Sequence, residues 1–282
     1  MSYFFYKKMH GLENDFVIID SRDVSFFPNS NFIKSLSERK TGLGFDQLII
    51  IENVDDKISD CKIKIYNADG TEAENCGNAL RCVGRIMFDQ LNKTNVIIET
   101  KAGLIDVEEE KNGLISVDMG LAKFLWNDIP LSHPLDTSNL DIDLFFLKGG
   151  YAINIGNPHV VFFVNDMNQK FEKDCQTITK MNIFPKGINI NIAKVLSKNE
   201  IELKVYERGC GFTRACGTGA CATAIVALKL KLSRNHVTVK MPGGALNINY
   251  LNDGHVIMTG PVSMICDGKF NANDFMGTVN EK

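Results

Sequence analysis

The sequence lacks several features that would each indicate a particular class of protein. Its 282 residues carry a net charge of only −3, and no cluster of Lys and Arg offers a surface for nucleic acid. No apolar run approaches the length of a membrane span, and the first residues lack the apolar segment and cleavage site of a signal peptide. We therefore expect a cytoplasmic protein with neither a nucleic-acid nor a membrane partner.

Metal-binding patterns are also missing. The eight cysteines include no Cys-x-x-Cys pair, the five histidines are dispersed, and no His-Glu-x-x-His occurs. We predict no bound metal on these grounds. The composition, with 44% hydrophobic and 23% charged residues, is typical of a globular protein, and the length suits two domains.

The chain contains an internal repeat. A shift of 140 residues places residues 63–66 on 203–206 and Cys76-Gly77 on Cys216-Gly217. Three further pairs align in the same order at shifts of 140, 141 and 143: residues 117–120 with 257–260, 96–98 with 237–239, and 14–18 with 157–161. Such agreement indicates tandem duplication. We assign residues 1–119 to a first repeat, rejoined by a C-terminal tail over 263–282, and residues 120–262 to a second.

Each repeat reads as strands, one helix and more strands. Alternating residues 62–66 and 202–206 predict half-buried strands, and a helix follows Cys76 and Cys216 in turn. The second helix is small or apolar nearly all round, so we expect sheet to surround it. The predicted fold is α+β. It has two pseudo-symmetric duplicated domains, each a curled, mainly antiparallel sheet around a central helix, with the active site in the cleft between them and a linker near 120–130.

A cysteine at the start of each helix has useful chemistry. Free backbone N–H groups and the positive end of the helix dipole favour an anion there, which lowers a thiol pKa from about 8.5 toward neutrality. Gly77 and Gly217 let a substrate carboxylate approach the same N–H groups. One thiol can then remove the α-proton of an amino acid from one face while the other returns a proton to the opposite face. The pattern predicts a racemase or epimerase.

Two other considerations bear on this chemistry. An isolated cysteine often packs as a small core residue, as we expect for Cys82 and Cys221 inside the helices. The repeated position of Cys76 and Cys216 favours a functional role for them instead. Many enzymes abstract an α-proton with pyridoxal phosphate, but no residue stands out as a cofactor lysine. We therefore expect no cofactor, and donors at the helix starts that stabilise the reacting carboxylate.

Two segments carry a specific resemblance. Residues 67–82 read NADGTEAENCGNALRC, and residues 207–220 read ERGCGFTRACGTGA. They resemble the two cysteine signatures of the diaminopimelate epimerase family. Shorter segments also fall where that family has motifs, namely residues 10–16, 44–47, 156–159, 242–244 and 259–261. The resemblance covers almost the whole chain.

This resemblance implies a function and a set of site residues. It implies cofactor-independent interconversion of LL- and meso-diaminopimelate, on the route to lysine and peptidoglycan, by an enzyme that forms a homodimer. Cys76 and Cys216 would be the acid/base thiols, and His159 and Glu207 would tune or orient them. The implied substrate-binding residues are Asn14, Gln47, Asn67, Gly77, Asn78, Asn157, Asn189, Glu207, Arg208, Gly217 and Thr218.

Two positions depart from the family pattern, and two alternatives stay open. Glu13 and Ala79 stand where the family has glycine; the first is expected to alter its loop, and the second to be harmless within a helix. A proline racemase or hydroxyproline epimerase of the same fold would have no distal amino-acid end for Glu207 and Arg208 to hold. A non-catalytic binding module or thiol redox switch would retain its function when either cysteine is replaced by serine, or would follow the disulfide state.

Overall fold

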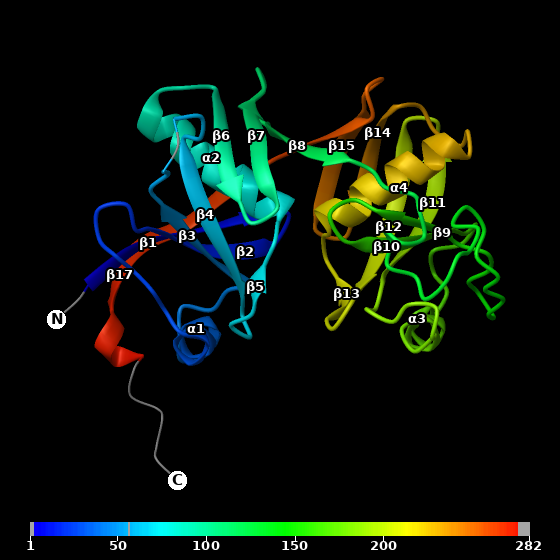
Figure 1. Cartoon of the computed structure of the whole chain (residues 1–282), viewed down its shortest axis with the longest axis horizontal. Helices are drawn as coiled ribbons and strands as arrows, with labels where there is room; N and C mark the ends of the chain where they lie inside the picture. The colour runs from blue at the N-terminus through cyan, green and yellow to red at the C-terminus, as the bar shows by residue number, and fades with distance from the viewer. Residues whose placement is uncertain (1–2, 56, 276–282) are drawn as a thin grey trace, which may run out of the picture. The chain divides into compact units, whose positions relative to one another are not determined.

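The computed structural model describes residues 3–55 and 57–275, and the chain divides into two compact units (Figure 1). The first consists of Met1–Val117 with Pro261–Lys282, and the second of Asp118–Gly260. The last seven residues of the predicted C-terminal tail, 276–282, lie outside the described residues. Among the described residues, no helix is long and apolar enough to cross a membrane.

The first unit is a mixed, mostly antiparallel sheet with one long helix. Its elements in chain order are β1 (Tyr3–Gly11), β2 (Asn14–Asp20), α1 (Ser30–Ser37), β3 (Gln47–Glu52), β4 (Cys61–Asn67), β5 (Glu72–Ala73), α2 (Gly77–Leu91), β6 (Asn95–Thr100), β7 (Gly103–Glu109), β8 (Ile115–Leu121), β17 (Ser263–Asn271) and the 3₁₀ turn Ala272–Asp274. The predicted return of the C-terminal segment is seen in β17, which pairs antiparallel with β1. The chain passes from the first unit to the second within β8.

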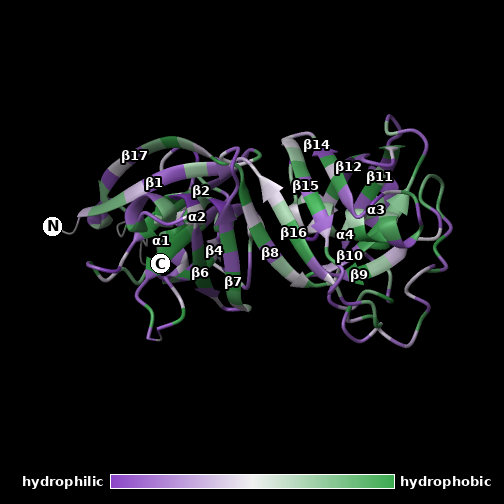
Figure 2. Cartoon of the chain, turned by 90° about the horizontal axis from the view of Figure 1, so that it is seen from above, coloured by the Kyte–Doolittle hydropathy of each residue, from purple (hydrophilic) through white to green (hydrophobic). Residues whose placement is uncertain are grey.

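The second unit repeats this plan. Its elements are β9 (Tyr151–Asn154), β10 (Pro158–Phe163), α3 (Glu172–Ile178), β11 (Asn189–Ser197), β12 (Glu200–Glu207), β13 (Gly211–Thr213), α4 (Gly217–Lys229), β14 (His236–Met241), β15 (Gly244–Tyr250) and β16 (His255–Gly260). Polar and apolar residues alternate along the strands of both units (Figure 2), as a sheet with one buried face requires. Both predicted helices are confirmed, although α4 ends two residues before the expected residue 231.

Strand register shows the duplication position by position. In the first unit Phe16 pairs with Gln47 in parallel strands, and Gln47 pairs with Asn67. In the second unit His159 pairs with Asn189 in the same way, and Ile190 pairs with Tyr206 as Leu48 pairs with Tyr66. Phe16, Gln47 and Asn67 therefore correspond to His159, Asn189 and Glu207.

The register corrects one sequence alignment. Val107 pairs with Val117 in the first unit, and the corresponding Ile248 pairs with Met258 in the second. Val117 therefore corresponds to Met258 at a shift of 141, and not to Ile257 at the predicted shift of 140. Because side chains alternate between the faces of a strand, a shift of one residue exchanges buried and exposed positions. Val117 and Met258 are both fully buried, as this correspondence requires.

The helices differ in how completely the sheet encloses them. α2 is buried from Gly77 to Phe88 apart from the half-buried Arg85, contacts β1, β2, β6 and β7, and exposes residues 89–91 in its last turn. α4 has small or apolar residues all round. It contacts seven strands, β9 to β12 and β14 to β16. Residues Gly219 to Ala227 of α4 are all buried. The prediction that sheet surrounds the second helix is confirmed.

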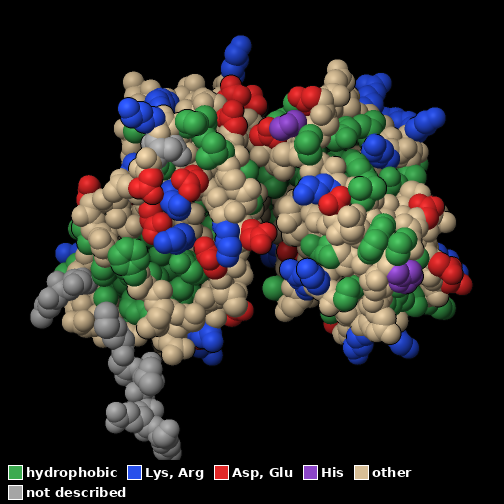
Figure 3. Space-filling model, viewed as in Figure 1, with side chains coloured by type: hydrophobic (Ala, Val, Ile, Leu, Met, Phe, Trp, Pro, Cys, Tyr) green, Lys and Arg blue, Asp and Glu red, His purple; other side chains and the backbone are tan. Residues whose placement is uncertain are grey.

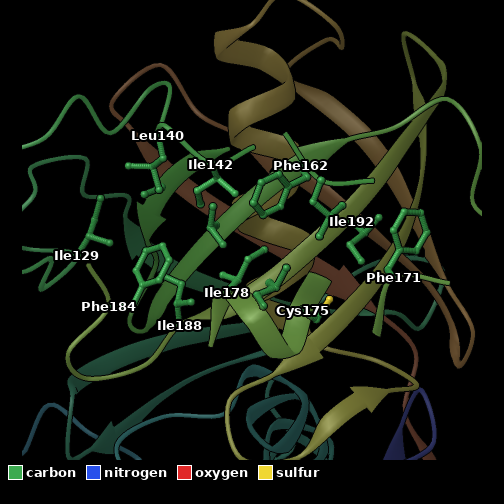
Figure 4. Close-up of a cluster of buried hydrophobic side chains, with 14 of the residues drawn as sticks. Ile129, Leu140, Ile142, Phe162, Phe171, Cys175, Ile178, Phe184, Ile188 and Ile192 are labelled. Carbon is green, nitrogen blue, oxygen red and sulfur yellow. The ribbon is translucent and has the colours of Figure 1, made fainter. Parts of the chain in front are cut away.

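Each unit has its own hydrophobic core. In the first, Phe26, Phe32, Phe45 and Phe270 pack with aliphatic residues of β2 and β3 around α1. The corresponding cluster of the second unit is built from β10, β11, α3 and the segment before β9 (Figure 4). Ile129 belongs to this second cluster, so residues 120–130, which we expected to form a linker, are instead part of the packed second unit.

Candidate active site

Cys76 occupies the N-cap position of α2. Its backbone is extended, with φ of −150°, and no side chain caps the helix, so the first N–H groups of α2 are available to a ligand. The Cys76 Sγ donates to Asn14 Oδ1 at 4.0 Å, and Asn78 Nδ2 donates to the same oxygen at 3.3 Å. Three residues predicted for the site, Cys76, Asn14 and Asn78, are thus brought together in the first unit.

A group of charged residues lies behind Asn14. Asn14 Nδ2 donates to Asp46 Oδ2 at 2.8 Å, and the Arg39 guanidinium joins Asp46 to Asp15 through bonds of 2.7 to 3.0 Å. Burial alone would raise the pKa of Asp15, but hydrogen bonds and charge from Arg39, helped by Lys8, bring it below its ordinary value. Asp15 is therefore anionic at neutral pH.

Gln47 and Asn67 face each other across β3 and β4. Gln47 Nε2 donates to Asn67 Oδ1 at 2.9 Å. In the described part of the chain, Gln47 Oε1 is buried without a hydrogen-bond partner, and so is Oδ1 of Asn75, the residue before Cys76. A buried acceptor without a donor is costly, so each oxygen is suited to a donor such as a substrate ammonium group.

Cys216 occupies the N-cap position of α4, and it is only 6% exposed. Its Sγ lies 3.5 Å from Thr218 Oγ1, and its backbone N–H donates to Met241 Sδ at 3.4 Å. Burial, and after it the charge of Glu207, raise the pKa of the Cys216 thiol well above its ordinary value. The predicted lowering of the pKa at a helix start is therefore wrong for this thiol, because desolvation outweighs the hydrogen bonds that Thr218 and the Gly219 backbone offer to the thiolate.

His159 reaches Cys216 through Thr218. The imidazole is fully buried, and its Nε2 lies 3.0 Å from Thr218 Oγ1 and 2.8 Å from Asn157 Oδ1. Burial lowers the pKa of His159 to about 4, so the ring is neutral at physiological pH. Its Nδ1 faces Asn191 Oδ1 at 3.2 Å. Asn191 turns its oxygen toward Nδ1 because its amide nitrogen is engaged elsewhere, and Nε2 contacts both the Asn157 amide oxygen and the Thr218 hydroxyl.

Asn191 and Thr223 complete a buried polar network that the sequence did not reveal. Asn191 Nδ2 donates to the Gly219 carbonyl at 3.0 Å and to Thr223 Oγ1 at 3.2 Å. The register places Asn191 where the first unit has Ile49, and the alignment of the helices places Thr223 where it has Val83. Neither residue lies in a quoted motif. The feature that distinguishes Asn191 and Thr223 is that each is polar where the equivalent buried position of the first repeat is apolar.

The remaining predicted residues lie at the ends of β11 and β12. Asn189 is buried. Its Nδ2 donates to the Pro158 carbonyl and its Oδ1 accepts from the Arg208 backbone N–H, so its side chain holds two backbone segments together. Glu207 Oε1 accepts from Thr213 Oγ1 at 2.6 Å. Arg208 is exposed, and its guanidinium donates to the Lys186 carbonyl at 2.6 Å.

A cavity of about 350 Å³ lies in the first unit beside α1, away from Cys76. Phe4, Phe26, Phe27, Phe32 and Phe275 line it, and apolar side chains gather on this face of the unit (Figure 3). Its lining includes no titratable side chain to act as an acid or a base, so its size does not make it an active site. The residues that the structure describes contain no group of three His, Cys, Asp or Glu placed to hold a metal.

Solved structures show which fold class this is. A hydroxyproline epimerase from Agrobacterium vitis superposes with a TM-score of 0.69 at 12% identity, covering 96% of this chain and 91% of that one. A PhzF-family phenazine biosynthesis protein from Enterococcus faecalis superposes with a TM-score of 0.70 at 11% identity, covering 96% and 100%. The chain therefore has the duplicated fold of these epimerases and PhzF proteins, and the predicted fold class is confirmed.

Sequence comparison narrows the class to one family. The family model described as diaminopimelate epimerase matches residues 6–125 and 151–265. The diaminopimelate epimerase of Erythrobacter litoralis is 42% identical over 96% of this chain and 98% of its own length. That of Phenylobacterium zucineum is 39% identical over 93% and 96%. The chain belongs to the diaminopimelate epimerase family.

Proposed function

We propose that the chain interconverts LL- and meso-diaminopimelate without a cofactor, as a step toward lysine and peptidoglycan. The observation that carries this proposal is the repeated thiol at an uncapped helix start, Cys76 before α2 and Cys216 before α4, in a chain of this family. Each thiol lies beside backbone N–H groups that can bind a carboxylate. We assign one thiol to each repeat, with the repeats at residues 1–119 and 120–262.

The two thiols exchange protons with opposite faces of one carbon. A thiolate takes the α-proton and becomes a thiol, and the electron pair left on the carbon spreads into the carboxylate. N–H groups at Gly77-Asn78 and Gly217-Thr218 stabilise that charge as it develops. The second thiol then donates its proton to the other face and becomes a thiolate. The net reaction inverts the centre and consumes nothing.

Several residues support recognition of an acyclic substrate with a second amino-acid end. Asn14 and Gln47 line the reacting end, where the buried Gln47 Oε1 is an acceptor for an ammonium group, and the following residues hold the second end. The Arg208 guanidinium suits a carboxylate, and Glu207 suits an ammonium group. Asn67 and Asn157 add amides for the remaining polar groups, and Asn189 positions the Arg208 backbone. A cyclic imino acid has no second end, so these residues favour diaminopimelate over proline or hydroxyproline.

The test is α-proton exchange in D₂O with LL-diaminopimelate and with L-proline as separate substrates. We expect inversion and deuterium incorporation with diaminopimelate alone. Deuterium incorporation into proline, with none into diaminopimelate, would refute our proposal and favour a proline racemase.

Single cysteine variants test the two-thiol mechanism. Cys76→Ser and Cys216→Ser should each abolish inversion, because a single acid/base group serves only one face. Cys266→Ser, which changes an exposed cysteine of β17, is the control and should keep full turnover. Full turnover in either of the first two variants would refute the mechanism and favour a binding module or redox switch.

We further propose a cytoplasmic homodimer. Both thiols must stay reduced for the reaction, and a reducing compartment ensures this. The strands β1 and β17 expose Tyr3, Phe5, Met264 and Ile265, with Phe5 75% exposed, and this apolar surface suits a second copy of the chain. Light scattering should show a dimer for the native chain and a monomer for Phe5→Glu.

A further inference from the structure

We propose that Asp46 is a positioning residue for the Cys76 thiol. Its carboxylate holds the side-chain amide of Asn14 so that the amide oxygen, and not the amide nitrogen, faces the Cys76 Sγ. This inference rests on the proposed role of Cys76 as an acid/base group. Asp46 does not contact the thiol; it acts on the thiol through its hydrogen bond to Asn14.

The hydrogen bonds form a directed chain across the first unit. Arg81 Nη2 donates to Asn78 Oδ1 at 2.9 Å, and Asn78 Nδ2 donates to Asn14 Oδ1 at 3.3 Å. Asn14 Nδ2 then donates to Asp46 Oδ2 at 2.8 Å. A guanidinium, which only donates, stands at one end of the two amides, and a carboxylate, which only accepts, stands at the other.

These two ends determine how each amide points. If the Asn14 amide turned over, its oxygen would face the Asp46 carboxylate and its NH₂ group would face the NH₂ group of Asn78. Two hydrogen bonds would be lost, one of them charge-assisted, and like-charged atoms would meet in their place. Asp46 therefore sets the orientation of Asn14, and Arg81 sets that of Asn78.

Asp46 is well anchored for this task. Its Oδ1 accepts from Arg39 Nη2 at 2.7 Å, and its Oδ2 also accepts from the Asp15 backbone N–H at 3.0 Å. The Asp46 backbone N–H donates to Asp15 Oδ1 at 3.0 Å. Arg39 in turn forks onto Asp15. Besides Asn14, two donors thus hold the Asp46 carboxylate, and a third hydrogen bond holds its backbone.

The consequence for Cys76 concerns its protonation. An oxygen acceptor beside Sγ stabilises the S–H form and disfavours the thiolate, whereas an NH₂ group would stabilise the thiolate. The charged groups of the first unit around this contact are Asp46, Asp15, Arg39 and Lys8 behind Asn14, and Arg81 on α2 next to the buried thiol of Cys82. The N–H groups at the start of α2 favour the Cys76 thiolate, so Asn14 opposes them and keeps the thiol available as an acid.

The experiment measures the pKa of Cys76 directly, without turnover. Alkylation of Cys76 by iodoacetamide is followed against pH by peptide mass spectrometry, in a Cys216→Ser background. Asp46→Ala should lower the pKa by about 0.5 to 1 unit, the size of one hydrogen bond transferred to the charged form. Asp46→Asn, which preserves shape but permits both orientations of Asn14, should give a smaller shift in the same direction.

Asn14→Ala separates the relay from a direct effect of charge. With Asn14 absent, Asp46→Ala should leave the Cys76 pKa unchanged, because the proposed coupling runs through the amide. An equal shift with and without Asn14 would overturn the proposal, since it would mean that the Asp46 charge acts through space. No shift in Asp46→Ala or Asp46→Asn would overturn it as well.

Asp20→Asn is the matched control. Asp20 also holds a guanidinium in a fork, that of Arg22, but at the opposite end of β2 from Asn14. It should leave the Cys76 pKa where it was, and a shift there would count against the relay. Failure of the proposed function would appear differently, as inversion that survives Cys76→Ser, so the two outcomes are distinguishable.

Discussion

The buried polar network of the second unit can be exchanged for the apolar residues that occupy the same positions in the first. His159, Asn191 and Thr223 correspond to Phe16, Ile49 and Val83, and all six side chains are fully buried. We predict that Asn191→Ile alone is severely destabilising. The triple variant His159→Phe, Asn191→Ile, Thr223→Val should be far less so.

The magnitude follows from the contacts. Asn191→Ile removes the hydrogen bonds to Gly219, Thr223 and His159 and leaves the His159 Nδ1 and the Thr223 hydroxyl buried without that partner. Each buried group left without a partner costs about 1–3 kcal/mol, so we expect a loss of about 2–5 kcal/mol. The triple variant removes all three fully buried polar side chains, and Asn157 and Thr218, which lose their contact with His159, are only half-buried. We therefore expect it to lie within about 1.5 kcal/mol of the native chain.

Trp126 provides the assay. It is the sole tryptophan of the chain, and it packs against the core of the second unit, so its fluorescence reports the unfolding of that unit in urea. The triple variant should fold and yet lose turnover, because it lacks the His159 contact to Thr218. A triple variant at least as unstable as Asn191→Ile alone would refute the reasoning, since losses at the three positions would then add.

Three further predictions follow from particular residues. Glu13 and Leu12 have φ of +67° and +56° in the β1–β2 turn, so Glu13→Gly should raise the free energy of unfolding by up to about 1 kcal/mol, read by thermal circular dichroism; an unchanged or lower stability would contradict strain there. A Cβ on Gly219 would meet Val205 Cγ2 at 3.0 Å, so Gly219→Ala should cost about 1–3 kcal/mol in urea unfolding, and a neutral result would show that α4 can shift. Burial raises the pKa of Cys175 to about 12, so its contribution to stability is present below pH 9 and is lost as the pH rises through 12. Cys175→Ala should therefore reduce the decline in stability between pH 9 and pH 10 by about 1 kcal/mol, measured by Trp126 fluorescence, and an equal decline in both chains would be evidence against it.

Much of the fold could be predicted because the repeat is carried by local patterns. The helix after each cysteine and the strand before it have periodicities that sequence alone reveals, and both repeats show them in the same order. The expected start of α2 after Cys76 agrees with the structure to the residue. The site residues within the two cysteine motifs could be predicted for the same reason, because their positions depend on local structure. A helix that starts after Cys76 places Gly77 and Asn78 beside its thiol. Their roles in catalysis stay predictions.

What could not be predicted depends on pairing across strands. The correspondence of Asn191 with Ile49 appears only when both parallel strand pairs are in register. The predicted alignment of β8 with β16 was wrong by one residue. Sequence similarity alone did not distinguish the two registers, whereas strand pairing does. The Cys216 pKa was predicted in the wrong direction because helix position is local, whereas burial depends on the whole unit.

The enclosure of α4 has a consequence for how this chain can vary. A helix that touches sheet on every side has no surface on which substitutions go unnoticed, so nearly every change in Gly219 to Ala227 should be rejected in a mutational scan. Asp89 and Gln90 of α2 face solvent and should accept many residues. We therefore expect substitutions to be accepted in the exposed last turn of α2 and rejected along α4, which begins at the Cys216 thiol.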